Sequence, residues 1–215
     1  MKLFPAWMVV KSLFADELRG TAIDVLFGSA LDKAMVKMNY YYRKGVDNYL
    51  EAAANYMSLA IKEEAARMGI KLSNEDEGRM IERGSKILEA FQRTPAFGLL
   101  RPKTRLVVID ESIGMYVQPD FYDGYSIYEV KSFNPTKTRY AYYQVRLFQL
   151  GYPDSEAVLV GFDGNTLDPI IIRINRISEE DRHRIIMDVA KFGSSNGVEG
   201  EPDRDVIIKY STRGG

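Results

Sequence analysis

The pattern of apolar residues changes at the segment TPAFG, residues 94–98, and this change limits the folds open to the chain. Before it, apolar side chains recur at helical spacing. After it, short runs rich in valine, isoleucine and tyrosine predict β-strands. We therefore expect a helical region over residues 1–97 packed on an α/β core over residues 98–215, in one compact unit.

Helices are expected before this boundary at residues 15–38, 46–69 and 73–94. Gly69 is a suitable C-cap for the second helix. Ser73 or Asn74 is a suitable N-cap for the third, which stops before Pro95.

Strands alternate with helices after the boundary. Strands are expected at residues 104–112, 114–122, 125–133, 156–163 and 169–175. Helices are expected at residues 137–152 and 178–193, with Ser178 as N-cap and Gly193 at the end. A late short strand fits residues 205–210. This order predicts an α/β fold, with a central mixed β-sheet flanked by helices on both faces.

The cysteine and histidine content limits the kinds of catalytic and metal-binding site that the chain can form. The 215 residues include no cysteine and one histidine, His183. Disulfides, thiol catalysis and thiolate metal sites are thereby excluded, and zinc sites or histidine triads nearly so. A metal would need oxygen ligands, which favours Mg²⁺, Mn²⁺ or Ca²⁺. The lack of cysteine also fits a heat-adapted source.

Hydropathy and charge limit the partners. No stretch reaches the roughly 18 apolar residues of a membrane span. The first twenty residues lack a signal-peptide cleavage site, so we expect a cytoplasmic protein (in the host cytoplasm if viral) with no membrane partner. The net charge is −1, so binding to nucleic acid would depend on local basic patches.

The segment QPDFYDGYSIYEVKSF, residues 118–133, carries charges that a core strand does not need. Alternate strand residues point the same way, so Glu129 and Lys131 share a face, roughly 6–7 Å apart. A tight return at Asp123 would bring Asp120 beside Glu129. Neighbouring carboxylates repel unless a proton or cation lies between them, and a divalent metal keeps both ionised. The alternative is a solvated strand face.

Pro119-Asp120 followed by Glu129-Val130-Lys131 resembles the signature of the PD-(D/E)XK nuclease superfamily. The resemblance covers residues 98–175 and one N-terminal helix. It implies a restriction-endonuclease-like core in which Asp120, Glu129 and the Val130 carbonyl bind Mg²⁺ or Mn²⁺. It also implies that Lys131 helps to position the attacking water.

The resemblance extends to the RecB-like branch, which includes the CRISPR-adaptation exonucleases. Its Gln-x-x-x-Tyr helix is similar to QVRLF, with Gln144 in the glutamine position and Phe148 in place of tyrosine. Its Gly-x-x-x-His helix is similar to FGSALDKA, with Gly28 followed by Asp32 in place of histidine. The resemblance implies that Gln144 positions Lys131 or the phosphate backbone. Asp32 is either a further metal ligand or a solvated helix acid. Archaeal viral nucleases and Holliday-junction resolvases of the superfamily are similar in overall shape.

Positive charge is segregated along the chain. Residues 130–153 and 97–109 contain no acid, and further basic residues follow Asp32. We expect nucleic acid to be bound by Lys137, Arg139, Arg146, Lys33 and Lys37. An ordinary salt-bridged surface is the alternative.

These features predict a Mg²⁺- or Mn²⁺-dependent deoxyribonuclease that forms a homodimer or higher homo-oligomer. It would hydrolyse DNA phosphodiester bonds in replication, repair, recombination or viral genome processing. The alternative is a catalytically silent DNA-binding or assembly protein on a nuclease fold. The choices between DNA and RNA, and between exonuclease and endonuclease, stay open.

Overall fold

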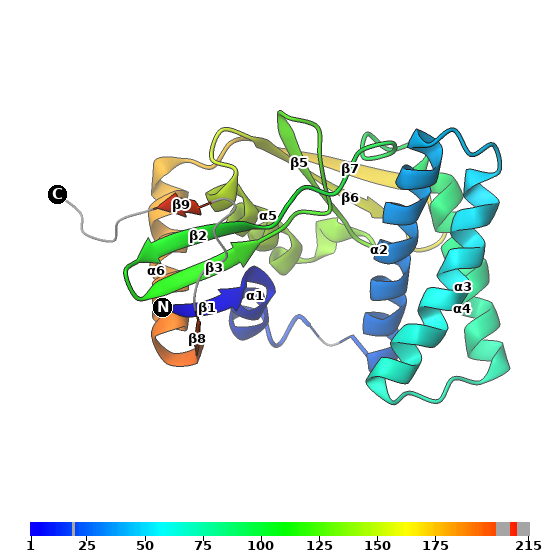
Figure 1. Ribbon diagram of the computed structural model, residues 1–215, viewed down its shortest axis with the longest axis horizontal. Helices are drawn as coiled ribbons and strands as arrows, with labels where there is room; N and C mark the ends of the chain where they lie inside the picture. The colour runs from blue at the N-terminus through cyan, green and yellow to red at the C-terminus, as the bar shows by residue number, and fades with distance from the viewer. Residues whose placement is uncertain (19, 201–206, 210–215) are drawn as a thin grey trace.

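The computed structural model describes residues 1–18 and 20–200 and the backbone of residues 207–209 (Figure 1). In chain order, its elements are β1 (Lys2–Pro5), α1 (Ala6–Leu13), α2 (Ala22–Arg43), α3 (Tyr49–Met68), α4 (Asn74–Phe91), β2 (Arg105–Asp110), β3 (Ile113–Val117), β4 (Phe121–Tyr122), β5 (Ser126–Val130), the 3₁₀ turn η1 (Pro135–Lys137), α5 (Arg139–Gly151), β6 (Glu156–Phe162), β7 (Pro169–Ile174), α6 (Glu179–Asn196), β8 (Val198–Glu199) and β9 (Ile207–Lys209). The expected α/β class with a helical region is confirmed.

The strands form two mixed sheets rather than one central sheet. The first has the order β8-β1-β3-β2-β9 and the second the order β4-β5-β6-β7. The predicted strand at residues 114–122 is interrupted after Val117, and β4 begins only at Phe121. Pro119 lies in this gap and has no backbone N–H to offer a neighbouring strand. The chain therefore passes from one sheet to the other directly before Asp120.

The first residues of the chain belong with the sheets, although the sequence places them in the helical region. β1 pairs in parallel with β3, and Phe4 lies opposite Met115. Phe4 of β1 and Val9 and Val10 of α1 are buried in the same apolar cluster as Met115. The N-terminal strand thereby closes one side of the β2–β3 pair.

Helix α5 lies between the two sheets (Figure 1). Its Val145 and Phe148 are buried in one cluster with Met115 of the first sheet and Ile127 and Leu159 of the second. Helix α5 is therefore held in place by apolar packing against both sheets. This packing also sets the position of Gln144, which lies one helical turn before Phe148.

Helices α2, α3 and α4 stand together on the opposite side of the second sheet, at the right of Figure 1. A second apolar cluster joins Met35 of α2, Met57 of α3 and Phe91 of α4 to Val158 and Val160 of β6. Each face of this sheet thus has its own apolar core. Within the described residues, no helix is both long enough and apolar enough to cross a membrane.

Several helix caps agree with the sequence, although the helix bounds differ by a few residues or more. Gly69 ends α3 at a left-handed φ of 67°, and Ser73 and Ser178 cap α4 and α6, as predicted. The first long helix begins at Ala22 instead of residue 15, because Thr21 and Asp24 form a capping box there. The last helix continues past Gly193 to Asn196.

Gly161 is a close-packing point beside the loop that follows β5. A Cβ at this position would lie 2.4 Å from the Phe133 carbonyl oxygen and 2.2 Å from Pro135 Cδ. The neighbouring Phe162 backbone N–H donates a hydrogen bond to the same Phe133 oxygen at 3.2 Å. The missing side chain therefore lets the loop before α5 lie directly on β6.

We expect Gly161→Ala to lower the free energy of unfolding by roughly 1–3 kcal/mol, because the added methyl group forces the loop off β6. Urea denaturation measures the change. Gly164→Ala is the control, since a Cβ there would meet nothing within 4 Å. Equal effects of the two substitutions would contradict this account of Gly161.

Candidate active site

Asp120 is held at the edge of β5 by a backbone hydrogen bond. Among the described strands, β4 pairs with β5 only through Phe121 with Tyr128 and Tyr122 with Ile127. The Val130 N–H lies beyond these pairs and donates to Asp120 Oδ2 at 2.8 Å. The side chain of Asp120 thus replaces a strand partner, and this places its carboxylate next to the Glu129-Val130-Lys131 segment.

The turn before β5 has the geometry that the sequence predicts. Asp123 Oδ1 accepts hydrogen bonds from the backbone N–H groups of Tyr125 and Ser126 at 2.8 and 2.7 Å. Gly124 has a φ of 100°, which favours glycine. Asp123 is therefore a turn residue, and its Oδ2 also accepts a hydrogen bond from the Tyr128 hydroxyl.

Glu129, Lys131 and Gln144 meet between β5 and α5. Lys131 Nζ donates to Glu129 Oε1 at 2.7 Å and to Gln144 Oε1 at 2.8 Å. Glu129 is 4% exposed. Its second oxygen, Oε2, is buried and has no hydrogen-bond partner among the described residues. A buried carboxylate oxygen without a partner is costly, so this atom marks a position suited to a cation or a water.

Asp32 is connected to the site by Arg101. Arg101 is not among the site residues predicted from the sequence. Arg101 Nη2 donates a hydrogen bond to Asp32 Oδ1 on α2 and lies 3.3 Å from Asp120 Oδ1. Arg101 lies between α4 and β2, in the acid-free stretch 97–109. This acid-free stretch is the sequence feature that could have indicated Arg101, because a basic residue in it can pair with acids clustered elsewhere.

The acids of the site act strongly on one another. Burial, followed by the charges of Glu129 and Asp32, raises the pKa of Asp120 well above its ordinary value, and Arg101 and Lys131 offset this only in part. Burial alone would lower the pKa of Lys131, but the Glu129 and Asp120 carboxylates raise it. The site thus contains three carboxyl groups but only two cationic side chains. An added cation would reduce the repulsion among the carboxylates.

This donor set fits a divalent cation that prefers oxygen ligands. Asp120 and Glu129 supply carboxylates, and the free Glu129 oxygen is available without breaking another contact. Even so, no group of three carboxylate or histidine side chains in the described part of the chain is arranged to hold a metal. Arg101 occupies the space between Asp32 and Asp120. Asp120, Glu129, Asp32 and the Val130 carbonyl therefore all stay predictions as ligands.

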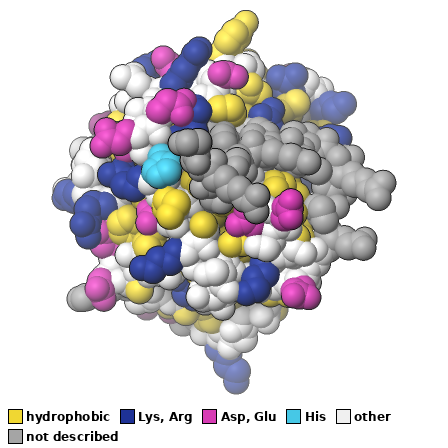
Figure 2. Space-filling model, turned by 90° about the vertical axis from the view of Figure 1, so that its left-hand side faces the viewer, with side chains coloured by type: hydrophobic (Ala, Val, Ile, Leu, Met, Phe, Trp, Pro, Cys, Tyr) yellow, Lys and Arg dark blue, Asp and Glu magenta, His cyan; other side chains and the backbone are white. Residues whose placement is uncertain are grey.

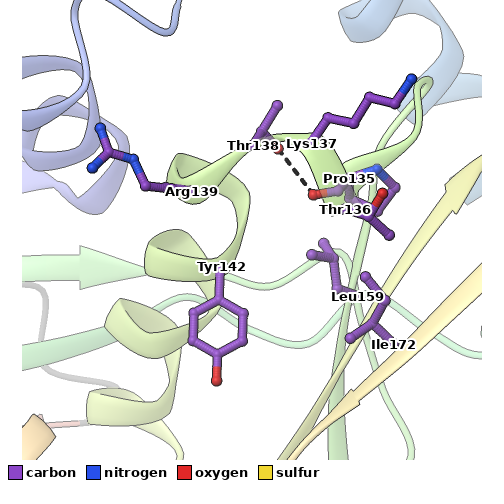
Figure 3. A pocket seen from close by; sticks show the side chains of 8 residues that line it. All are labelled: Pro135, Thr136, Lys137, Thr138, Arg139, Tyr142, Leu159 and Ile172. Carbon is purple, nitrogen blue, oxygen red and sulfur yellow. Dashed lines mark hydrogen bonds between the residues drawn. The ribbon is translucent and has the colours of Figure 1, made fainter.

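Two of the predicted nucleic-acid-binding residues line a groove at the start of α5. Figure 3 shows the side chains of Lys137 and Arg139 pointing outward, away from Leu159 of β6, and Tyr142 of α5 also lines the groove. Leu159 is the β6 residue that pairs with Glu129. One residue of the groove and Glu129 thus lie on neighbouring strands, and none of Asp32, Asp120 and Glu129 lines the groove itself.

The other predicted contact residues are engaged within the chain. Arg146 donates to the Gln149 side chain and to the Asn175 carbonyl, both at 2.8 Å. Lys33 Nζ is 2.7 Å from Glu64 Oε1. Lys37 Nζ lies over tyrosine rings, 5.4 Å from the Tyr56 centroid. For these three residues, as for Lys137 and Arg139, a role in binding DNA stays a prediction.

The end of the molecule that carries α6 shows a different surface. There, basic and acidic side chains are intermixed around the histidine (Figure 2). His183 is exposed on α6. This face has the character of an ordinary charged surface, in contrast to the groove beside α5.

Comparisons with known proteins add no family. No family model matches the chain, and no curated protein matches it. A solved structure described as "Crystal structure of SSO0001" is 12% identical, with 89% of this chain and 86% of that chain covered and a TM-score of 0.39. Similarity at this level assigns neither fold nor function. The resemblance to PD-(D/E)XK nucleases stays an expectation from the motif.

The ion pairs around Lys33 give a pH-dependent prediction. Hydrogen bonds from Arg67 and then Lys33 lower the pKa of the buried Glu64 to about 2. The folded-state pKa lies below the unfolded value of 4.5, so the stabilisation is complete above pH 4.5 and is lost as the pH falls toward 2. We expect Glu64→Gln to cost about 1–3 kcal/mol of unfolding free energy at pH 7 and less at pH 3.

Urea denaturation at pH 7, 4 and 3 checks this difference. Glu63→Gln is the matched control, because the Glu63 side chain is 65% exposed and lies 3.8 Å from Lys33 Nζ. A cost for Glu64→Gln that does not change with pH would show that the ion pairs do not stabilise the α2–α3 contact.

Proposed function

We propose that this chain is a Mg²⁺- or Mn²⁺-dependent nuclease that hydrolyses DNA phosphodiester bonds. The observation that supports it most is the buried Glu129 Oε2, which lacks a partner next to the Asp120 carboxylate. The large majority of buried polar side-chain atoms have a hydrogen-bond partner, so an unpaired carboxylate oxygen calls for a functional explanation. The agreement with the spacing of the PD-(D/E)XK signature adds support.

Each residue has a defined task in this proposal. Asp120 and Glu129, with the Val130 carbonyl, hold the divalent cation. When bound, the cation would lower the pKa of a water and neutralise charge on the scissile phosphate. Lys131 orients that water or a phosphate oxygen through its ammonium group. Gln144 fixes the position of Lys131 Nζ from α5.

The groove of Figure 3 supplies a path for the substrate strand. Lys137 and Arg139 are exposed and can approach phosphates, although Arg139 also pairs with Glu17 in the free protein. Tyr142 is 45% exposed and can stack on a base. We place this activity in the cytoplasm, in a homodimer or higher homo-oligomer, and it covers both exonucleolytic and endonucleolytic cutting.

A catalytically silent DNA-binding protein is the second candidate. It is favoured by the contact of Arg101 with both Asp32 and Asp120, which partly neutralises the acids without a metal. Under this hypothesis the chain binds DNA but neither Mn²⁺ nor a scissile phosphate. Measurements of DNA cleavage and of Mn²⁺ binding separate the two candidates.

We expect Glu129→Gln to reduce metal-dependent cleavage by roughly a hundredfold or more, because it keeps the side-chain volume and removes a charged ligand. Labelled single-stranded, duplex, flap and four-way-junction DNA are incubated with Mg²⁺ or Mn²⁺, and the products are separated on denaturing gels. Glu156→Gln, an exposed acid on the neighbouring strand, is the control.

Two outcomes would count against the nuclease. Full activity in a folded Glu129→Gln variant would remove Glu129 from the site. DNA binding by the wild type without cleavage of any substrate, together with no Mn²⁺ binding by titration calorimetry, would favour the silent protein.

The groove gives a separate expectation for binding. Lys137→Ala should weaken DNA binding and reduce the slope of log K against log salt by about one, because one phosphate contact is lost. Fluorescence anisotropy at several salt concentrations measures both. Lys191→Ala, at an exposed position on α6, is the control. Equal salt slopes for all three proteins would place the DNA outside the groove.

A further inference from the structure

We propose that Arg101 holds the place of the divalent cation between Asp32 and Asp120 and is displaced when the metal binds. This inference rests on the proposed nuclease function. It adds a residue outside the motif and a change of partners within the site. The metal-free site is then a closed form, stabilised by the chain's own cation.

The position of one nitrogen atom is the first argument. Arg101 Nη2 contacts Asp32 Oδ1 and Asp120 Oδ1 together. These carboxylates come from separate parts of the fold, α2 and the residue before β4. A cation shared by carboxylates of two elements has the arrangement that a divalent ion would adopt with the same oxygens.

The contact is also incomplete, which favours exchange. A fixed arginine typically engages carboxylates through parallel N–H groups of its planar guanidinium. Here Nη2 carries both acid contacts, and Arg101 Nε is buried without a hydrogen-bond partner among the described residues. Displacement would therefore break few hydrogen bonds, because Arg101 contacts the acids through Nη2 alone in the closed form.

The charges favour the same exchange. Asp32, Asp120 and Glu129 face the single charges of Arg101 and Lys131. Replacing the guanidinium by a divalent ion adds one positive charge at the centre and brings the partly filled ligand set of Asp120 and Glu129 into use. The Arg101 side chain is 30% exposed, so it can turn toward solvent without crossing an apolar core.

Direct measurement of Mn²⁺ affinity tests the exchange without using activity. Wild type, Arg101→Gln and Lys131→Gln are titrated with Mn²⁺ in the absence of DNA, and free Mn²⁺ is measured by electron paramagnetic resonance. We expect Arg101→Gln to bind Mn²⁺ about tenfold or more tightly than the wild type, because the competing cation is gone. Lys131→Gln is the control, since it removes a neighbouring charge that contacts Glu129 but does not lie between Asp32 and Asp120.

Unchanged or weaker Mn²⁺ binding by Arg101→Gln, with Mn²⁺ bound by the wild type, would overturn the exchange and leave the nuclease intact. An equal gain in Lys131→Gln would also overturn it, because general repulsion would then explain both. Absence of Mn²⁺ binding in every protein, with no metal-dependent cleavage by the wild type, would remove the proposed function itself.

A second measurement serves if Arg101→Gln fails to fold. The Nε–H resonance of Arg101 in the wild type, assigned with Arg101→Lys, is followed by NMR as Mg²⁺ is added. We expect it to move in step with metal binding. A resonance that stays unchanged while Mg²⁺ binds would show that Arg101 keeps its contacts, which would overturn the exchange.

Discussion

The Val130 N–H donates to Asp120 Oδ2 at 2.8 Å, at an edge of β5 beyond its pairs with β4. The other features of the site depend on this bond. It brings the residue at the crossing between the two sheets to the strand that carries Glu129. Without it, the Asp120 carboxylate would have no fixed place next to Glu129, and Arg101 would have one acid to contact instead of two.

The site lies at the second sheet, whose two faces pack against separate apolar cores. One core surrounds α5 and both sheets, and the other joins α2, α3 and α4 to the far face of the second sheet. Glu129, Lys131 and Gln144 lie on the α5 side, whereas Asp32 comes from α2. The carboxylates thus come from elements that pack in different apolar cores, and Arg101 contacts both Asp32 and Asp120. Such an arrangement keeps acids close together in spite of their repulsion.

The sequence predicts the local features of the site and misses those that depend on tertiary contacts. The alternation of β5 sets the common face of Glu129 and Lys131, and Asp123 sets the turn, because both follow from short-range geometry. The split into two sheets, the pairing of β1 with β3, and the place of Arg101 depend on segments far apart in the chain. The ion pair of Lys33 with Glu64 could not be predicted, because Glu64 lies on another helix.

A diffraction experiment on crystals grown with Mn²⁺ tests the central claim most directly, since the anomalous signal locates the ion. We expect a peak bonded to Asp32, Asp120 and Glu129 Oε2, with the Arg101 guanidinium moved away from both aspartates. Crystals soaked in saturating Mn²⁺ that show no peak at these carboxylates, with Arg101 still bridging Asp32 and Asp120, would contradict it.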